Sequence, residues 1–516
     1  MDSITFKNFR QFKDETTFEL KNINILVGKN NSGKSTLTKG IRLYLFNLQK
    51  LEEDSFNNPF NKMPFFKFGS NAYDNPHVGT FGRAFTKGST DDSILFSACF
   101  GHITIKTTVT RYYKDIDGTL IDCFDKTTAP ISRISITDDD FSAHYVFDFE
   151  NSIQKIEINS RGADLRNKLW TEELAEIKKD PQRYKKNKLG EWRFVLSQDA
   201  ERAETINRCL SYSNKNDIII EEPLQLSLPD GKLYMNILTG ALKGALENHI
   251  KHTSHNGSKI KIEDYLLLLE IIRKTSIAIA WNVIGDEIEY IEAHSVTHSV
   301  VYNITDKNDY MAQTILNYLN EGIRQNDPEK EFIEDWMMKF DIGEDFEIES
   351  IGGECYKLNI IEDVDHPKNT ISLLDIGVGS NQIMILLLQM ATIMHKNRGA
   401  AIPPLVIIEE PEQNLHPKLQ SFLADLFREV YLYPIKENEN SRGISFIIET
   451  HSEYLVRKSQ VLVAKRKQID TNPFTVFYME KGKVPRQIRY QDDGVFYDDI
   501  GEGFYDEAIS LTEEIV

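Results

Sequence analysis

The feature that most constrains this chain is the octapeptide Gly28-Lys29-Asn30-Asn31-Ser32-Gly33-Lys34-Ser35. It fits the phosphate-loop pattern G-x-x-x-x-G-K-[ST] at every fixed position. The apolar run at 23–27 is typical of a buried strand, and residues 36–48 carry apolar side chains at helical spacing. A chance glycine-rich turn is the alternative, but a strand before the loop and a helix after it remove most chance matches. The sequence therefore predicts a strand, loop and helix that bind a nucleoside triphosphate.

The chemistry of this loop follows from its residue types. Glycines let backbone N–H groups curl around phosphates, and the N-terminus of the following helix adds positive partial charge. We expect Lys34 to reach the β- and γ-phosphates of the nucleotide and the Ser35 hydroxyl to bind Mg²⁺. The predicted phosphate-binding residues of this segment are Gly28, Asn30, Asn31, Ser32, Gly33, Lys34, Ser35 and Thr36.

The composition is that of an ordinary globular protein, with 41% hydrophobic and 27% charged residues among 516. The four cysteines are far apart and form no CxxC pair, which argues against a disulfide framework or a zinc site. The N-terminal residues lack the apolar segment of a signal peptide, and the longest apolar stretch, 383–394, is too short to span a bilayer. We expect a cytoplasmic protein without a membrane partner.

The net charge of −19 disfavours indiscriminate coating of nucleic acid, which depends on Lys and Arg at the phosphates. A local basic groove remains compatible with it. The segment 178–193 carries Lys and Arg residues with Tyr184 and Trp192 between them, and such a cluster could bind nucleic acid. A charged loop and a solvated helix face are the simpler interpretation, so DNA binding stays open.

Local patterns divide the chain into four parts. Residues 1–150 contain alternating strands at 4–9, 17–20 and 103–110, and we expect them to form the N-terminal lobe around the phosphate loop. Residues 151–345 are more helical, with helices expected at 265–282 and 311–323. Strands return at 346–350 and 356–361 and open a C-terminal lobe that runs to residue 470. Residues 471–516 end the chain in an acidic tail.

Two apolar strands near the carboxyl end of the chain finish in polar residues. The run 404–410 ends in Glu409 and Glu410, and the run 444–452 ends in a polar segment that contains His451. Ligands gather at the carboxyl ends of buried parallel strands. There Glu409 can hold Mg²⁺, and Glu410 can orient and deprotonate the water that attacks the γ-phosphate. His451 is placed to reach the γ-phosphate, although an isolated histidine in such a place is more often a structural hydrogen-bonding group.

A glycine turn at 375–382 precedes the apolar helix expected at 383–394. The exposed N-terminus of this helix is suited to an anion, although an ordinary helix start would look the same. Its candidate ligand-binding residues are Gly377, Gly379, Ser380 and Gln382.

Four segments carry a family resemblance: the phosphate loop, the glycine turn at 375–382 and the strand ends at 404–410 and 444–452. In this order they resemble the nucleotide-binding domain of ABC-type ATPases, and more narrowly the RecF/SMC/OLD-like branch of AAA family ATPases. The resemblance covers about the first 50 and the last 150 residues. It is most specific in the segments 374–379, 408–417 and 449–455, and the opening segment 4–10 also matches. The middle of the chain carries little recognisable signal. It implies an α/β fold, an ABC-type P-loop ATPase head with a mixed sheet and a helical insertion. Lys34, Glu410 and His451 would be catalytic, Ser35 and Glu409 would hold Mg²⁺, and Arg10 would contact the nucleotide.

In this branch two subunits share each site. The resemblance therefore implies a homodimer or higher oligomer, in which the phosphate loop, Glu410 and His451 of one subunit face the 377–382 segment of the other. Two departures from the branch bear on this prediction. Ser380 and Asn381 stand where a Ser/Gly pattern is usual, and Glu409 stands where many relatives have Asp. No Q-loop glutamine is identifiable before Thr110.

The same resemblance suggests an OLD-like ATPase without a Toprim nuclease domain, because no pattern of such a domain follows His451. We expect a sensor or regulator that controls a separate effector, such as a nuclease, in prokaryotic antiviral defence. A RecF-like ATPase that binds DNA directly is the main alternative. A scaffold that hardly hydrolyses ATP also remains open, whereas a transporter subunit would need a clear Q-loop and a membrane-coupling surface.

Overall fold

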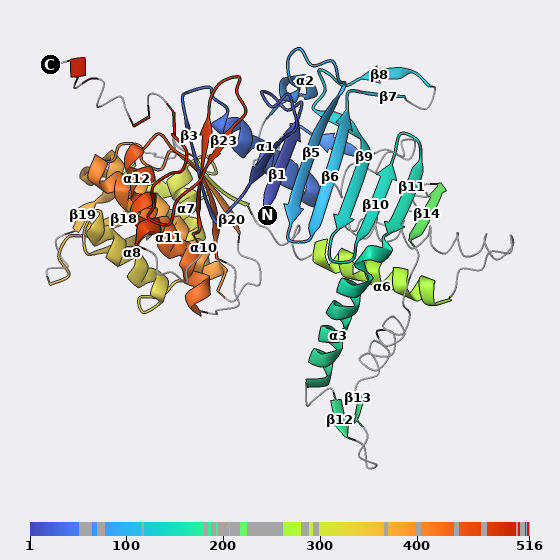
Figure 1. Cartoon of the computed structure of the whole chain (residues 1–516). Coiled ribbons are helices and arrows are strands. Elements are labelled where there is room, and N and C mark those ends of the chain that lie inside the picture. Colours follow the sequence, from blue (N-terminus) through green and yellow to red (C-terminus); the bar gives the residue numbers. More distant parts are fainter. Residues whose placement is uncertain are drawn as a thin grey trace. The chain divides into compact units, whose positions relative to one another are not determined.

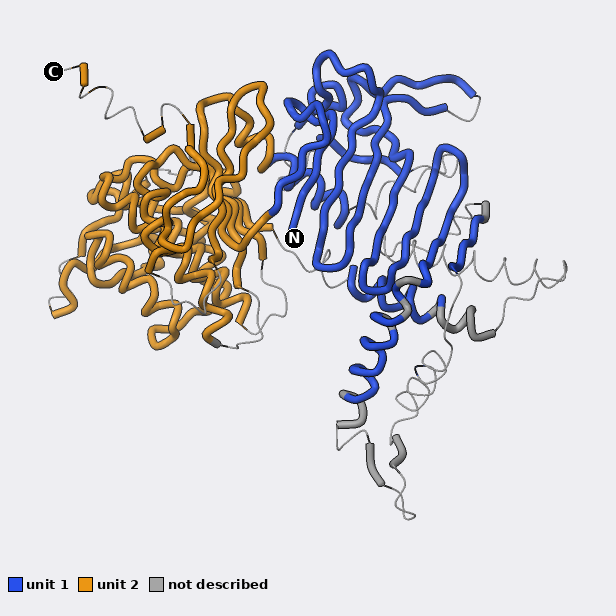
Figure 2. The backbone as a smooth tube through the Cα atoms, viewed as in Figure 1, with its two compact units in different colours: residues 1–19, 39–284 blue, residues 20–38, 285–516 orange. Residues whose placement is uncertain are grey.

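The computed structural model describes residues 1–50, 64–69, 78–114, 118–179, 184–186, 192–194, 206, 217–223, 262–279, 288–292, 299–365, 370–398, 404–437, 443–465, 472–501, 504–505, 511 and 513–514. It forms two compact units. Unit 1 comprises residues 1–19 and 39–284, and unit 2 comprises residues 20–38 and 285–516 (Figure 2). Helix α1 (Lys34–Lys50) begins in unit 2 and continues in unit 1. The phosphate loop therefore belongs to unit 2.

Unit 1 is built on an antiparallel sheet with the strand order β14-β11-β10-β9-β6-β5-β1-β2, and β4 pairs with β9 (Figure 1). Its strands are β1 (Ser3–Lys7), β2 (Thr16–Glu19), β4 (Phe65–Lys67), β5 (Ser93–Phe100), β6 (Ile103–Thr110), β9 (Thr128–Asp138), β10 (Ala143–Asp148), β11 (Ile153–Ile158) and β14 (Ile218–Pro223). Buried and half-buried residues alternate along β6, as the two faces of a sheet require. Aromatic rings fill the buried side, where Phe96 stacks on Tyr44 of α1.

Smaller elements complete unit 1. They are α2 (Phe81–Ala84), α3 (Ala163–Lys179), α6 (Ile262–Ile279) and two strand pairs, β7 (Tyr112–Lys114) with β8 (Leu120–Asp122) and β12 (Tyr184–Lys186) with β13 (Trp192–Phe194). Helix α6 is held against the sheet by Thr275, which donates a hydrogen bond of 2.5 Å to the buried Asp138.

Unit 2 contains a six-stranded sheet with the order β15-β20-β21-β3-β22-β23. Its strands are β15 (Ile288–Ile291), β20 (Leu405–Glu409), β21 (Ser445–Glu449), β3 (Ile23–Gly28), β22 (Phe474–Met479) and β23 (Arg486–Ile488). The first five are parallel, and β23 is an antiparallel edge strand. Every residue of β3 and β22 is buried, as expected for a parallel sheet that is covered on both faces.

Helices surround this sheet (Figure 1). They are α7 (Tyr310–Glu321), α8 (Pro328–Lys339), α9 (Leu373–Ile376), α10 (Val378–Lys396), α11 (Pro417–Glu437) and α12 (Glu453–Ala464). A small antiparallel sheet of β16 (Tyr302–Asn303), β17 (Asp345–Gly352), β18 (Cys355–Ile361) and β19 (Thr370–Ser372) accompanies them. Helix α10 contacts α7 and α8, and its apolar residues join the core of the unit.

The α/β class with a mixed sheet is confirmed. The predicted strands at 4–9, 17–20, 103–110, 346–350 and 356–361 are present with slightly different ends, and so are the helices at 265–282, 311–323 and 383–394. One arrangement differs from the expectation of strands around the phosphate loop. Strand β3 pairs with β21 and β22 from the far end of the chain, whereas β1 and β2 belong to the sheet of unit 1.

The expectations for the domain boundaries, the basic cluster and the acidic tail stay predictions. The structure divides into discontinuous units, and the functional boundaries after residues 150, 345 and 470 stay predictions. In the basic cluster, Arg183 and Lys188 lie outside the described residues, and so does most of the acidic tail from residue 502 onward. Within the described part of the chain, no helix has the length and apolar character needed to cross a membrane.

Candidate active site

The predicted chemistry of unit 2 converges at the carboxyl edge of its parallel sheet. Strand β21 lies between β20 and β3, and in register Glu449 is paired with Glu409 on one side and with Leu26 on the other. The phosphate loop starts at Gly28, the last residue of β3. The loop and the two acidic strand ends are therefore neighbours, although the sequence places more than 400 residues between Gly28 and Glu449.

The backbone of the phosphate loop needs its glycines. Gly28 and Gly33 have φ of 141° and 107°, values that side chains rarely allow. A Cβ at Gly28 would lie 2.1 Å from the carbonyl oxygen of Met479. The first turn of α1 begins at Lys34, and the N–H groups of Thr36 and Leu37 donate to the Gly33 carbonyl. The strand, loop and helix predicted from the sequence are confirmed.

The Lys34 side chain folds back over the loop. Only 4% of the residue is exposed, and Nζ donates hydrogen bonds to the carbonyl oxygens of Gly28 at 2.8 Å and Lys29 at 3.3 Å. Burial lowers the pKa of Lys34, and the carboxylates of Glu449 and Glu410 partly offset that effect. The ammonium group therefore lies inside the loop in which a phosphate would be bound.

Ser35 contacts a carboxylate that the sequence did not single out. Its hydroxyl donates a hydrogen bond of 2.9 Å to Oε1 of Glu449. Burial raises the pKa of Glu449 to about 7, with a further contribution from the charge of Glu409. In the sequence, Glu449 ends an apolar strand and begins the segment 449–455 that carries part of the family resemblance, but no role was predicted for it.

Glu410 follows β20 in a strained backbone conformation. Its φ of 45° lies in the left-handed region, which costs a non-glycine residue on the order of 1–3 kcal/mol. Its N–H donates to the Glu449 carbonyl at 2.7 Å, and its carboxylate accepts a hydrogen bond from Gln413 and lies 3.8 Å from Nε2 of His451. The structure therefore brings the predicted catalytic side chains of Glu410 and His451 together.

A second buried glutamate fixes the position of His451. Glu412 accepts a hydrogen bond of 2.6 Å from the His451 backbone N–H, and burial raises the pKa of this glutamate. The next residue, Ser452, caps helix α12 by accepting from the N–H of Leu455. Burial and the charge of Lys34 lower the pKa of His451, which favours the neutral imidazole at pH 7. Glu412 lies in the segment 408–417 that carries part of the family resemblance, but no role was predicted for it.

The glycine turn before α10 contacts the acidic strand of the same chain. Gln382 donates a hydrogen bond of 3.4 Å to the backbone oxygen of Glu410. A Cβ at Gly379 would lie 2.7 Å from the carbonyl oxygen of Asn414, so this glycine permits close packing. Gly377, with φ of 111°, has open space beside its Cα. The contact of this segment with a second subunit stays a prediction.

Arg10, the remaining predicted nucleotide contact, belongs to unit 1. Its backbone N–H donates to the Ala84 carbonyl, and burial, with the nearby charge of Arg83, lowers the pKa of its guanidinium. Its contact with nucleotide stays a prediction.

The donor set suits a magnesium ion that is held together with a triphosphate. Among the described residues, no group of three or more His, Cys, Asp or Glu side chains could hold a metal by itself. Mg²⁺ commonly takes one or two protein oxygens and completes its shell with water and phosphate oxygens. Ser35 and Glu409 offer such oxygens at the edge of the loop, and Oε2 of Glu449 is buried without a hydrogen-bond partner among the described residues.

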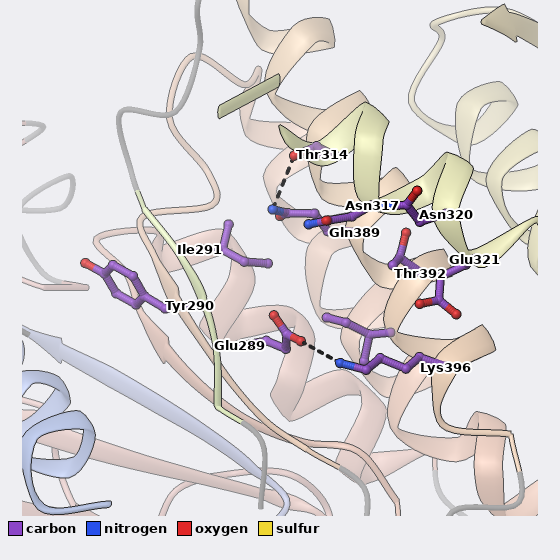
Figure 3. Close-up of a pocket in the computed structure, with 11 residues that line it drawn as sticks. Glu289, Tyr290, Ile291, Thr314, Asn317, Asn320, Glu321, Gln389, Thr392 and Lys396 are labelled. Atoms are coloured by element: carbon purple, nitrogen blue, oxygen red, sulfur yellow. Dashed lines mark hydrogen bonds and ion pairs between the residues drawn. The ribbon is translucent and has the colours of Figure 1, made fainter. Parts of the chain in front are cut away.

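A separate hollow of ≈ 210 Å³ lies between β15, α7 and α10. It is lined by polar side chains that include Asn317, Gln389 and Thr392, and Glu289 forms an ion pair with Lys396 at its edge (Figure 3). None of the predicted nucleotide-binding residues lines it.

One protein family and two solved structures are similar to this chain. The profile of the family described as "AAA ATPase domain" matches residues 1–456. No curated protein matches the chain. Among solved structures, the Smc head domain with an extended coiled coil, bound to the C-terminal domain of ScpA, from Pyrococcus furiosus is 12% identical, with a TM-score of 0.31 and coverage of 100% of this chain and 98% of that chain. The SMC head domain from Thermotoga maritima is 11% identical, with a TM-score of 0.31 and coverage of 95% and 98%. Because the family profile covers most of the sequence, the chain belongs to the AAA ATPase domain family.

Proposed function

We propose that this protein is an ABC-type ATPase of the OLD-like branch that binds and hydrolyses ATP and controls a separate effector. The observation that carries the proposal is the convergence of Lys34, Ser35, Glu410 and His451 at one edge of the sheet. A cation for the phosphates, a hydroxyl for Mg²⁺ and a group that positions the attacking water recur in enzymes that transfer phosphoryl groups to water. Lys34, Ser35 and Glu410 can supply these groups, and His451 can add a hydrogen bond to the phosphate.

Each side chain takes one role in the proposed reaction. Lys34 leaves the carbonyl groups of its own loop and binds the β- and γ-phosphates. Glu410, which is oriented by Gln413, positions the attacking water and accepts its proton. The neutral His451 donates a hydrogen bond to the γ-phosphate and lies close enough to Glu410 to orient it. Ser35 and Glu409 would hold Mg²⁺, which neutralises the phosphate charge when it is bound.

The proposed active form is a homodimer or higher oligomer that closes around ATP. Support comes from the resemblance of the 377–382 segment to the signature of ABC-type ATPases, which faces the nucleotide of the other subunit. Gln382 contacts the backbone of Glu410 in its own chain. A partner that binds residues 377–382, the signature segment, would therefore act next to Glu410, the proposed catalytic base of the same chain.

The proposed biological role is that of a sensor or regulator of a nuclease or other effector in prokaryotic antiviral defence. It rests on the resemblance to OLD-like ATPases. The test is a phage challenge of cells that express this gene with its neighbours. We expect protection that is lost with Lys34→Ala, and that requires at least one neighbouring gene. Protection that survives Lys34→Ala would contradict the proposed role of ATP, and no protection at all would contradict the defence role.

A RecF-like ATPase that binds DNA directly is the second candidate. It is favoured by the basic cluster around the β12–β13 strand pair, whose sequence interleaves Tyr184 and Trp192 with Lys and Arg. Salt-dependent DNA binding by the purified protein tests it. Tight binding that is lost when Lys185, Lys186 and Lys188 are neutralised would favour this candidate, and unchanged affinity in that variant would remove the cluster as a DNA site.

A further inference from the structure

The third acidic position at the edge of the sheet is Glu449, the last residue of β21. Strand β21 lies between the strand of the phosphate loop and the strand that ends in Glu409. Glu449 is only 6% exposed, so its carboxylate has little access to water. It occupies the middle of the proposed nucleotide site, yet the roles assigned above leave it unused.

The two carboxylate oxygens of Glu449 have different surroundings. Oε1 accepts the hydrogen bond from Ser35. Oε2 is buried and has no hydrogen-bond partner among the described residues. The nearby ammonium group of Lys34 donates instead to the carbonyl oxygens of Gly28 and Lys29. A buried carboxylate oxygen without a donor is costly, because burial removes the water that would solvate it. This arrangement suits a carboxylate whose missing partner arrives with the ligand.

The hydrogen bond to Ser35 has a direction that matters for a metal. The Ser35 hydroxyl carries one proton and two lone pairs. Donation of that proton to Glu449 leaves the lone pairs free to face a cation. Hydrogen-bonded groups behind a metal ligand fix its orientation and increase its basicity, and their removal commonly weakens metal affinity by about 10- to 100-fold.

We propose that Glu449 is a positioning residue for the magnesium ion of the bound nucleotide. Its Oε1 would keep the Ser35 hydroxyl oriented so that the oxygen lone pairs remain available to the metal, and its Oε2, unpartnered among the described residues, would accept a hydrogen bond that the magnesium nucleotide supplies. This inference rests on the proposed ATP binding at the phosphate loop. It assigns the site three protein positions, Ser35, Glu409 and Glu449, where sequence reasoning provided two.

The test compares ATP binding with and without magnesium. The dissociation constant of ATP is measured for the wild type and for Glu449→Gln, once with Mg²⁺ and once with a chelator. Glutamine keeps the size of the side chain and an acceptor for Ser35 but removes the charge. In the chelator, we expect Glu449→Gln to bind ATP with the affinity of the wild type. With Mg²⁺, we expect the variant to bind ATP about 10- to 100-fold more weakly than the wild type. Glu347→Gln, which changes an exposed glutamate of β17, is the matched control and should behave like the wild type.

Glu449→Asp separates charge from position. Aspartate keeps the charge on a shorter side chain, so we expect it to lose the Ser35 hydrogen bond and most of the magnesium dependence. Wild-type magnesium dependence in either variant would overturn the inference. An equal loss of ATP affinity with and without Mg²⁺ would also overturn it, because that result indicates a structural role. A wild type that binds no ATP under either condition would instead contradict the proposed function on which the inference depends.

Discussion

The carboxylates of Glu410, Glu412 and Glu449 lie near the carboxyl edge of the sheet in different surroundings, and each makes different contacts. Glu410 is half-exposed, strained and directed at His451, whereas Glu449 and Glu412 are buried. Glu412 holds a backbone N–H, and Glu449 holds the hydroxyl of Ser35. The apolar run that ends in Glu409 and Glu410 predicted that these side chains lie at the carboxyl end of a buried strand. The sequence could not predict the role of Glu449, because that role depends on the insertion of β21 between β20 and β3.

Burial of Glu449 predicts a pH effect on the stability of the nucleotide-free protein. Its pKa is about 7 in the folded chain against 4.5 for an ordinary glutamate, so the folded state binds the extra proton between these values. Stability therefore falls as the pH rises through this window. A shift of this size corresponds to about 3 kcal/mol. We expect Glu449→Gln to match the wild type near pH 4.5 and to be more stable by up to that amount above pH 7.

Urea unfolding at several pH values, without nucleotide or magnesium, measures this difference. Glu347→Gln should keep the pH dependence of the wild type. A difference in the free energy of unfolding between Glu449→Gln and the wild type that stays constant across the pH range would contradict the raised pKa of Glu449 in the folded protein.

At the scale of elements, three helices of unit 2 meet at one buried carboxylate. Glu329 in the first turn of α8 accepts hydrogen bonds from Arg398, which follows α10, and from Tyr433 of α11. Its side chain is 0% exposed. Burial by itself raises the pKa of Glu329, but these hydrogen bonds outweigh it and keep the pKa below the ordinary value. Because α10 begins at the signature segment, this junction fixes the far end of a helix that belongs to the site.

Removal of Arg398 should therefore be costly. Arg398→Ala leaves the buried charge of Glu329 without its main partner, and such a loss costs about 3–5 kcal/mol. Lys483→Ala removes an exposed partner of Glu480 and should cost less than about 1 kcal/mol. Urea unfolding measures both free energies. Equal effects of the two substitutions would contradict the role of this junction, and Glu329→Gln added to Arg398→Ala should restore part of the loss.

Local sequence patterns predicted single helices and strands but not how the strands pair. Apolar periodicity predicted the buried strands and the long helices, since these patterns are local. It could not predict that β3 pairs with β21 and β22, or that β1 and β2 form part of another sheet, because strand pairing between distant segments has no local signal. The same holds for the contact of Gln382 with Glu410, which joins two motifs 28 residues apart.

For the whole molecule, the proposed function requires that the protein closes on a second copy when ATP is bound. Glu410→Gln should trap that state, because the variant binds ATP but lacks the base that activates water. Light scattering in ATP should then report twice the monomer mass, and in ADP the monomer. Ser380→Arg, which places a large cation in the signature segment, should abolish the dimer in the same background. A mass that does not depend on ATP or on Ser380 would contradict the proposal that two subunits share each nucleotide site.

ATP hydrolysis with Glu410 as the base is tested by the rate of phosphate release from ATP by the purified wild type and by Glu410→Gln, measured together with their ATP affinities. We expect magnesium-dependent turnover by the wild type. We also expect a loss of about 10²- to 10⁴-fold in the variant, because a positioned general base contributes that much, while ATP affinity is retained. Equal rates in the two proteins, whether near zero or substantial, would contradict the assignment of Glu410 as the catalytic base of an ATPase.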